Sequence, residues 1–356
     1  MSFRLISLLF KIGHVFGITP WSLQVPKISL LKKFYYVLIF VLIMYGFISR
    51  GVVQLRSHST QLILLYVINN IALAGQNSAF LLRSLTKRKS WISFLRNLET
   101  TAELTHVRTR TTAKNFFCCG FLFVTVLHLL TMTLTVFALP QFRSSNVWQE
   151  FYADYFLTLF NFHNQFLSCV LVNMIRTRYK NLRKMVQVHF ERRRKLHLES
   201  LKKIQYTVRS LKVTVDGYND LFGWINLFHI CNALARLVSL TEYGLARLTQ
   251  LELLKFNVLN VLCLIWIVAG TVTVISMMSL VLREYQDMTR FWLNPKLSLD
   301  VTKLEELKLT ECFRFFVQNA PEFTAANFFP IKRNILLNMS LIYVNSEIAM
   351  IQLGHL

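Results

Sequence analysis

The chain has 356 residues, of which 54% are hydrophobic and 16% are charged, and its mean hydropathy is +0.42. A soluble domain of this length needs a more polar surface, so the composition predicts an integral membrane protein. The formal net charge is +22, which in a membrane protein reports on orientation and does not indicate a nucleic-acid partner. The six cysteines show no paired CxxC spacing, so neither a metal site nor a cofactor is expected.

Seven apolar stretches are long enough to cross a hydrocarbon core of about 30 Å as helices of roughly 20 residues. The third and the sixth are the most continuously apolar, whereas the fifth and the seventh each contain an ionisable residue, Arg236 and Glu347. The predicted fold is therefore one all-α domain with seven transmembrane helices, near 34–53, 61–82, 115–138, 152–175, 221–241, 256–282 and 333–353.

Lysine and arginine are distributed unevenly about these spans. The N-terminal segment and the loops 83–114, 176–220 and 283–333 carry 34 of them, and the opposite side carries 5. The positive-inside rule then places the N-terminus in the cytoplasm. A G-protein-coupled receptor has the opposite orientation. The chain also lacks that class's Asp/Glu-Arg-Tyr triplet after span three and its Asn-Pro-x-x-Tyr in span seven.

Two cytoplasmic stretches have the apolar spacing of amphipathic helices. In the segment 176–220 the apolar positions recur at steps of three and four, namely Leu201, Ile204, Val208, Leu211 and Val215. A second segment, 299–319, places Leu309, Phe313 and Phe316 on one face. We expect spans four to seven to continue into a packed cytoplasmic bundle; binding of the basic residues to anionic lipid is an alternative that can coexist with it.

The chain shows no motif of an enzyme active site. It has no phosphate-binding glycine loop, no zinc-protease helix signature and no nucleophile elbow. An enzymatic function is therefore not expected.

The C-terminal 45 residues, CFRFFVQNAPEFTAANFFPIKRNILLNMSLIYVNSEIAMIQLGHL, resemble the C-terminal region of insect gustatory receptors. That family has a Phe-Thr-Ala stretch followed by paired Phe, and a last span ending in Thr-Tyr, five residues and Gln-Phe. The matching residues are Phe323, Thr324, Ala325, Phe328, Phe329 and Gln352, with Gly17 and Pro20 matching an N-terminal element. Asn345 and Ser346 stand in place of Thr-Tyr, and Leu353 replaces the closing Phe.

The resemblance implies a ligand-gated, non-selective cation channel in the plasma membrane of a sensory neuron dendrite. Four identical or related subunits would surround a central pore lined by span seven. A small-molecule tastant, bitter or another contact cue, would bind among the outer halves of spans two to six. The extended cytoplasmic helices would form the anchor of the tetramer.

The last span carries one polar line. Asn338, Asn345 and Gln352 are seven residues apart, and a helix advances about 100° per residue, so the three nearly superimpose, with Leu341 and Ile348 in the same stripe. Given the resemblance, we expect this stripe to face the pore. The alternative is that these amides form hydrogen bonds between helices without any pore.

Glu347 lies two residues from Asn345 and therefore on the opposite face of span seven. It and Arg236 in span five are predicted at similar depths, roughly 21 to 23 Å from the cytoplasmic ends of their spans. We predict an Arg236–Glu347 contact within the membrane, or the pairing of each residue with a nearby polar group. The alternative is that both side chains extend to the outer headgroups.

Residues of the outer halves with aromatic or polar side chains are candidates for the ligand pocket. Trp148, Asp154 and Tyr155 combine stacking surface with a hydrogen-bond acceptor, although aromatic residues at this level also form ordinary interfacial belts. The full set is Trp148, Asp154, Tyr155, Thr158, Phe162, Ser239, Glu242 and Asn260.

Several functions remain open beside a taste channel for bitter or other contact cues. They are a sugar-sensing receptor, an obligate coreceptor subunit and a seven-span metabotropic receptor of inverted topology. A transporter is disfavoured because the chain shows no internal repeat.

Overall fold

A computed structural model describes residues 10–14, 19–20, 30–57, 60–105, 145–192, 198–246, 251–293 and 303–354, with isolated positions between 120 and 133. Within this part the chain is helical apart from one small hairpin. The elements are α2 (Leu30–Ser57), α3 (Thr60–Thr86), α4 (Arg88–Leu104), α6 (Ser145–Arg192), α7 (Leu198–Ala246), α8 (Leu251–Leu293), α9 (Lys303–Gln318), β1 (Thr324–Ala325), β2 (Phe329–Pro330) and α10 (Asn334–Gly354). The predicted all-α membrane fold is confirmed; the third predicted span, 115–138, lies mostly outside the described residues.

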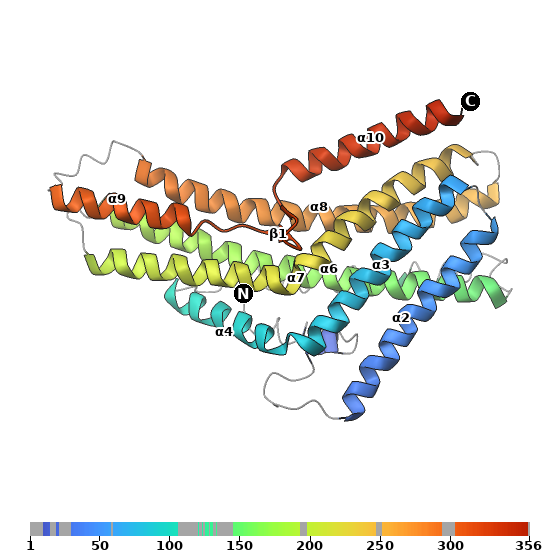
Figure 1. The fold of residues 1–356 in the computed structure, drawn as a ribbon, viewed down its shortest axis with the longest axis horizontal. Coiled ribbons are helices and arrows are strands. Elements are labelled where there is room, and N and C mark those ends of the chain that lie inside the picture. Colours follow the sequence, from blue (N-terminus) through green and yellow to red (C-terminus); the bar gives the residue numbers. More distant parts are fainter. Residues whose placement is uncertain are drawn as a thin grey trace.

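Three long helices form the axis of the molecule. Helices α6, α7 and α8 have 48, 49 and 43 residues, which corresponds to roughly 65 to 74 Å at about 1.5 Å per residue. They run side by side along the long axis, with α4 and α9 along one half and α2 and α3 along the other (Figure 1). Such helices are about twice as long as a hydrocarbon core of about 30 Å is thick, so each extends well beyond its predicted span.

Among the described residues, three helices contain a segment long and apolar enough to cross a membrane. The segments are Leu30–Ile48 in α2, Glu199–Val238 in α7 and Trp266–Phe291 in α8. Many apolar side chains of α2 are exposed, including Phe34, Val37, Val41 and Ile48. A face of this kind is stable against lipid and costly against water.

The amphipathic pattern of the extended part of α7 is confirmed. Leu201, Ile204, Val208, Leu211 and Val215 are all buried, and they belong to one continuous core. The apolar stripe therefore packs against the neighbouring helices, and the basic residues of this segment remain on the outer faces.

The inward face of α9 is displaced from the predicted one. Phe316 is buried as expected, and Cys312, one turn earlier, is buried with it. Phe313 is only half-buried, and the side chain of Leu309 lies outside the described residues. Cys312 and Phe316 are four residues apart and therefore share one helix face, whereas Phe313 lies beside it.

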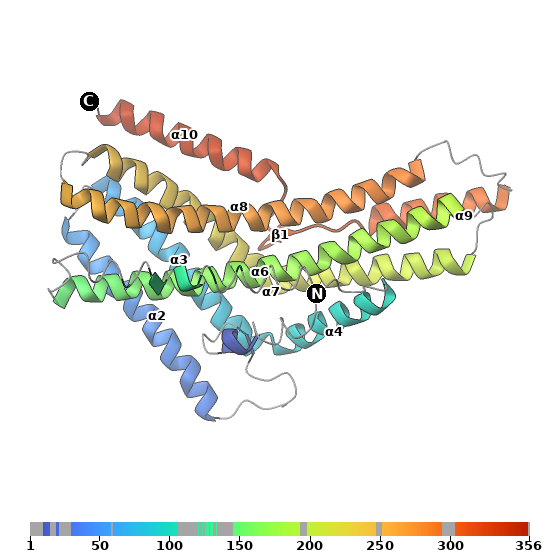
Figure 2. The same ribbon diagram turned by 180° about the vertical axis from the view of Figure 1, so that it is seen from behind.

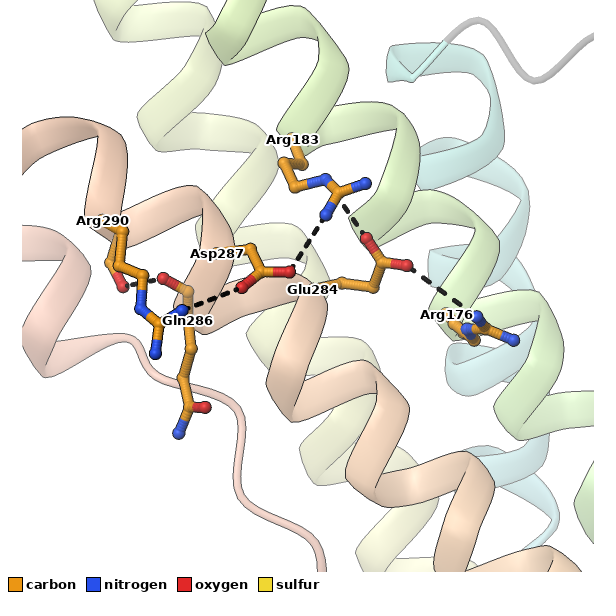
Figure 3. Close-up of polar contacts among 7 residues, drawn as sticks. Arg176, Arg183, Glu284, Gln286, Asp287 and Arg290 are labelled. Carbon is orange, nitrogen blue, oxygen red and sulfur yellow. Dashed lines mark hydrogen bonds and ion pairs between the residues drawn. The ribbon is translucent and has the colours of Figure 1, made fainter.

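An ion-pair network joins α6 to α8 in the extended part of the bundle (Figure 3). The Nε atom of Arg183 lies 3.3 Å from Glu284 Oε2, and its Nη1 donates to Asp287 Oδ2 at 3.1 Å. Arg176 approaches the other oxygen of Glu284 at 3.9 Å, and Arg290 lies 3.6 Å from Asp287. Glu284 is buried, so the arginines neutralise a carboxylate that burial alone would destabilise.

Helix α10 stands off the bundle, as both views show (Figures 1 and 2). The hairpin β1–β2 connects it to α9, with Thr324 opposite Pro330 and Ala325 opposite Phe329. Apart from buried Met339 and a few half-buried residues, the described side chains of α10 are exposed. One chain by itself therefore leaves most of this helix without a protein partner.

Candidate functional site

A line of buried polar side chains crosses the middle of the predicted spans. Its first contact joins α3 to α6, where Gln76 Nε2 donates to Asn161 Oδ1 at 2.6 Å. Both residues are buried, with 0% and 1% of their surface exposed. An amide pair at this depth has no access to bulk water, so its hydrogen bond is made within the protein.

One turn further along α6, Gln165 connects three helices. Its Nε2 atom lies 3.4 Å from His229 Nδ1 on α7 and 3.3 Å from Thr271 Oγ1 on α8. It also lies 3.4 Å from the carbonyl oxygen of Ile267. Gly270 makes room for this side chain, because a Cβ atom at that position would collide with Gln165 Oε1. The long amide therefore fills a groove that only glycine leaves open.

Several polar atoms in this region have no hydrogen-bond partner among the described residues. They include both amide atoms of Asn77, Asn164 and Asn232, together with Nε2 of His229. An unsatisfied buried polar group costs about 1 to 3 kcal/mol, and a concentration of them indicates a place where water or a polar ligand completes the hydrogen bonding. We call this set the polar seam: Gln76, Asn77, Asn161, Asn164, Gln165, His229, Asn232 and Thr271.

Of the residues predicted to form the ligand pocket, only Phe162 has a described side chain. It is half-buried, and its ring centroid lies 6.2 Å from those of Phe166 and Trp266. Phe162 follows Asn161 on α6, about 100° around the helix, so the aromatic cluster lies on a neighbouring face of that helix. The side chains of the other candidates lie outside the described residues: Trp148, Asp154, Tyr155, Thr158, Ser239, Glu242 and Asn260.

The polar seam was not predicted from the sequence, although a signal for it exists. Asn69 and Gln76 are seven residues apart, as are Asn70 and Asn77, and the polar positions of α6 and α7 recur at steps of three and four. Amides at helical spacing inside apolar spans indicate one polar face per helix. Which faces meet is decided only by the packing of α3, α6, α7 and α8.

The predicted pore stripe lies on the exposed surface of α10. Leu341 is 60% exposed and Ile348 is 48% exposed, and Asn338, Asn345 and Gln352 are exposed as well. The stripe is thus available for contact with other copies of the chain or for lining an aqueous path.

The proposed pair of Arg236 and Glu347 stays a prediction. Arg236 is half-buried on α7, whereas the side chain of Glu347 lies outside the described residues.

The hairpin before α10 is fastened to α7 by one side chain. Asn219 Nδ2 donates to the carbonyl oxygen of Glu322 at 2.7 Å, and its Oδ1 accepts from the N–H of Thr324 at 3.1 Å. Gly223, one turn further along α7, allows the hairpin to approach the helix closely. A Cβ atom at this position would lie only 3.1 Å from the nitrogen of Ala326. α7 therefore carries both part of the polar seam and the attachment of the α10 linker.

The turn of this hairpin has a left-handed backbone at two residues. Ala326 and Asn327 have φ angles of 52° and 62°, as a type I′ hairpin turn requires. Asn327 tolerates this conformation, and its Oδ1 accepts from Thr324 Oγ1 at 3.0 Å. Ala326 has no such compensation, so its packing against Gly223 holds the turn in place.

Replacing Asn219 is expected to loosen the hairpin. Asn219→Leu removes both hydrogen bonds, each of which contributes about 1 kcal/mol, whereas Asn219→Asp keeps the acceptor and loses the donor. We expect the melting temperature of the detergent-purified protein to fall most for the leucine variant and less for the aspartate variant. Equal melting temperatures for both variants and the wild type would contradict this role.

The fold and the buried polar seam define an all-α membrane protein with a polar interior site. No protein-family model matches the chain, and no curated protein matches its sequence. The structure is similar to that of the insect olfactory receptor OR5 from Machilis hrabei, with a TM-score of 0.68 and 17% identity over 98% of both chains. It is equally similar to OR5 in complex with eugenol, with a TM-score of 0.68 and 15% identity over 98% of this chain and 99% of that one. The chain thus shares the fold of an insect olfactory receptor.

Proposed function

We propose that this protein is a gustatory receptor that acts as a ligand-gated, non-selective cation channel in the plasma membrane. The fold likeness to an insect olfactory receptor supports a chemoreceptor, and the C-terminal resemblance to insect gustatory receptors supports taste over smell. The observation that supports a channel is the exposure of most of α10 in the single chain. Its exposed surface combines apolar residues with the line Asn338, Asn345 and Gln352.

We infer a pore from the surroundings that a helix with such a surface requires in a membrane. Lipid can cover Leu337 and Ile342, but amide side chains at membrane depth require water or a polar partner. Four copies placed around an axis satisfy both needs, because their polar lines face a shared aqueous path and their apolar sides face lipid or a neighbouring subunit. The pore residues are then Asn338, Leu341, Asn345, Ile348 and Gln352.

The ligand would be a small molecule with several hydrogen-bonding groups and an apolar face. The polar seam supplies donors and acceptors, and Phe162 and Trp266 supply stacking surface beside it. Contact cues such as bitter compounds fit this description. The number of amides in the seam also favours a second candidate, a sugar-sensing receptor.

Expression of the chain alone in a heterologous cell tests this function. We expect cation currents evoked by one or more members of a panel of sugars and bitter compounds, and we expect the currents to persist when G-protein signalling is blocked. Currents that disappear under that block would support a metabotropic receptor instead. Currents that require a coexpressed relative would make the chain a coreceptor subunit.

Cysteine substitution tests the pore stripe directly. We expect Ile348→Cys and Gln352→Cys channels to be blocked by a water-soluble thiol reagent applied during the ligand-evoked current, because both positions would face the aqueous path. Tyr343→Cys is the matched control, since residue 343 lies on nearly the opposite face from Asn345. Equal block at all three positions, or block at none, would contradict the assignment.

A further inference from the structure

A cavity opens beside the start of α10, and none of its lining residues belongs to the polar seam. It has a volume of about 720 Å³ and lies between α7, α8, α9 and the connection that leads from α9 to α10. Its lining includes Lys212, Tyr285, Gln286, Gln318, Lys332 and Arg333. A space of this size is typical of sites for small molecules.

The charge of the lining is predominantly positive. Lys212, Lys332 and Arg333 contribute three cations, and Glu322 contributes one anion. Lys212 is already paired, since its ammonium lies 2.6 Å from the carboxylate of Asp216. Lys332 and Arg333 are exposed and form no ion pair with any residue that the structure describes. The two cations next to α10 are therefore available to a ligand.

Backbone donors lie at the same place. The N–H of Ile331 is used, because it donates to the carbonyl oxygen of Phe323 at 2.7 Å. Within the described part of the chain, the N–H groups of Lys332, Arg333 and Asn334 have no acceptor. These groups precede or begin α10, whose N-terminus adds the positive end of the helix dipole.

We propose that this cavity binds a phosphate group, held by Arg333, Lys332 and the N–H groups at the start of α10. The planar guanidinium of Arg333 can bind two phosphate oxygens at once, and Lys332 adds a compact charge. The remaining volume, lined by Gln286 and Gln318, suits the hydroxyl groups of a polar headgroup. Glu322 opposes the anion and limits its affinity.

Two sources can supply this phosphate. Asn334 begins α10, which covers the last predicted span. With the predicted cytoplasmic N-terminus, the cavity lies at the level of the phosphorylated lipid headgroups of the cytoplasmic leaflet. A soluble phosphate compound of the cytoplasm has the same chemistry. The proposal goes beyond receptor function, because it rests on the cavity and its charges and not on any taste ligand.

A binding measurement on the full chain purified in detergent tests the proposal without channel activity. The probe is a fluorescent short-chain phosphatidylinositol bisphosphate, followed by fluorescence polarisation. Short-chain phosphatidylcholine, which is zwitterionic with no net charge and has no phosphate monoester, is the reference. We expect Lys332→Gln/Arg333→Gln to weaken binding about tenfold or more, since two charge-assisted contacts are lost. We expect Glu322→Gln to tighten binding, because it removes the opposing charge.

The matched control removes the same charge elsewhere. Lys202 and Lys203 are exposed on α7, and neither lines the cavity, so Lys202→Gln/Lys203→Gln should bind within about twofold of the wild type. Lys332→Arg/Arg333→Lys keeps both charges and should retain most of the affinity. A melting temperature close to that of the wild type shows that each variant is folded.

Competition identifies the source of the phosphate. Displacement of the probe by free inositol trisphosphate or inorganic phosphate, at concentrations close to that of the lipid, supports a soluble ligand. Displacement by the short-chain lipid alone supports a membrane headgroup. Equal affinities for Lys332→Gln/Arg333→Gln and Lys202→Gln/Lys203→Gln would overturn the proposal, as would binding of phosphatidylcholine as tight as that of the bisphosphate.

Discussion

Under the proposed channel function, a His229→Phe variant is expected to need roughly ten times more ligand, or more, for the same current. The substitution keeps an aromatic ring of similar size and removes both ring nitrogens. Nδ1 lies 3.4 Å from Gln165 Nε2, and Nε2 has no partner among the described residues. If a ligand completes that hydrogen bond, its loss costs about 1.5 kcal/mol, which corresponds to about tenfold in affinity. The measurement is the half-maximal concentration of a panel compound that activates the wild type.

The control for this experiment is Thr214→Val. Thr214 is also buried on α7, but its hydroxyl donates to the carbonyl oxygen of Ser210 in the same helix at 2.8 Å. The Thr214→Val variant therefore loses a buried hydrogen bond at a distance from the polar seam. Its half-maximal ligand concentration should equal that of the wild type. If both variants reach the cell surface and show the wild-type half-maximal concentration, the polar seam is not the ligand site.

Gln165→Met is a second, independent test of the same site. Methionine is close to glutamine in length and flexibility, but it cannot donate to His229, Thr271 and the carbonyl oxygen of Ile267. A shift in ligand sensitivity with an unchanged melting temperature would indicate contact with the ligand. A fall in melting temperature alone would indicate that Gln165 mainly holds α6, α7 and α8 together.

Arg178→Met is expected to produce the largest loss of stability in the extended half of the bundle. Arg178 is 3% exposed, and its Nε and Nη2 donate to the carbonyl oxygen of Leu98 at 3.1 and 2.7 Å. Its Nη1 donates to the carbonyl oxygen of Met174 at 2.7 Å. Burial lowers the pKa of Arg178 to about 10, which still leaves the group charged at neutral pH.

Loss of these contacts removes the polar attachment of α4 to α6. We expect the free energy of unfolding to fall by about 2 to 3 kcal/mol, because hydrogen bonds from a charged donor are stronger than neutral ones. Arg209→Met, on the exposed side of α7, is the matched control and should change stability by no more than about 0.5 kcal/mol. Indistinguishable unfolding curves of the two variants in detergent would refute the role of Arg178.

The arrangement of α7 suggests how ligand binding reaches the pore. Near its midpoint Asn219 and Gly223 hold the hairpin that leads into α10, and roughly two to three turns further along it carries His229 and Asn232 of the polar seam. A ligand that shifts α7 by a small amount would therefore move the attachment of α10, the proposed pore helix. The Asn219 variants and the His229 variant test these two parts of α7 separately.

The sequence by itself determined the features that depend on one helix at a time. The apolar spacing from Leu201 to Val215 specifies which face of α7 is buried, because these five apolar side chains all lie on one face of the helix. The seven-residue spacing of Asn338, Asn345 and Gln352 likewise defines one polar line on α10, whatever surrounds it. Composition and charge distribution were sufficient to predict an all-α membrane protein.

Only the tertiary structure decided the features that depend on contacts between distant segments. Gln76 meets Asn161, and Gln165 meets His229, across 85 and 64 residues of chain. The sequence shows these amides, but long-range pairing is fixed by how α3, α6, α7 and α8 pack, and no local pattern encodes it. Two further features depend on such contacts: the hydrogen bonds of Asn219 to Glu322 and Thr324, and the cavity beside Arg333. Each forms only where α7 meets the chain that leads into α10.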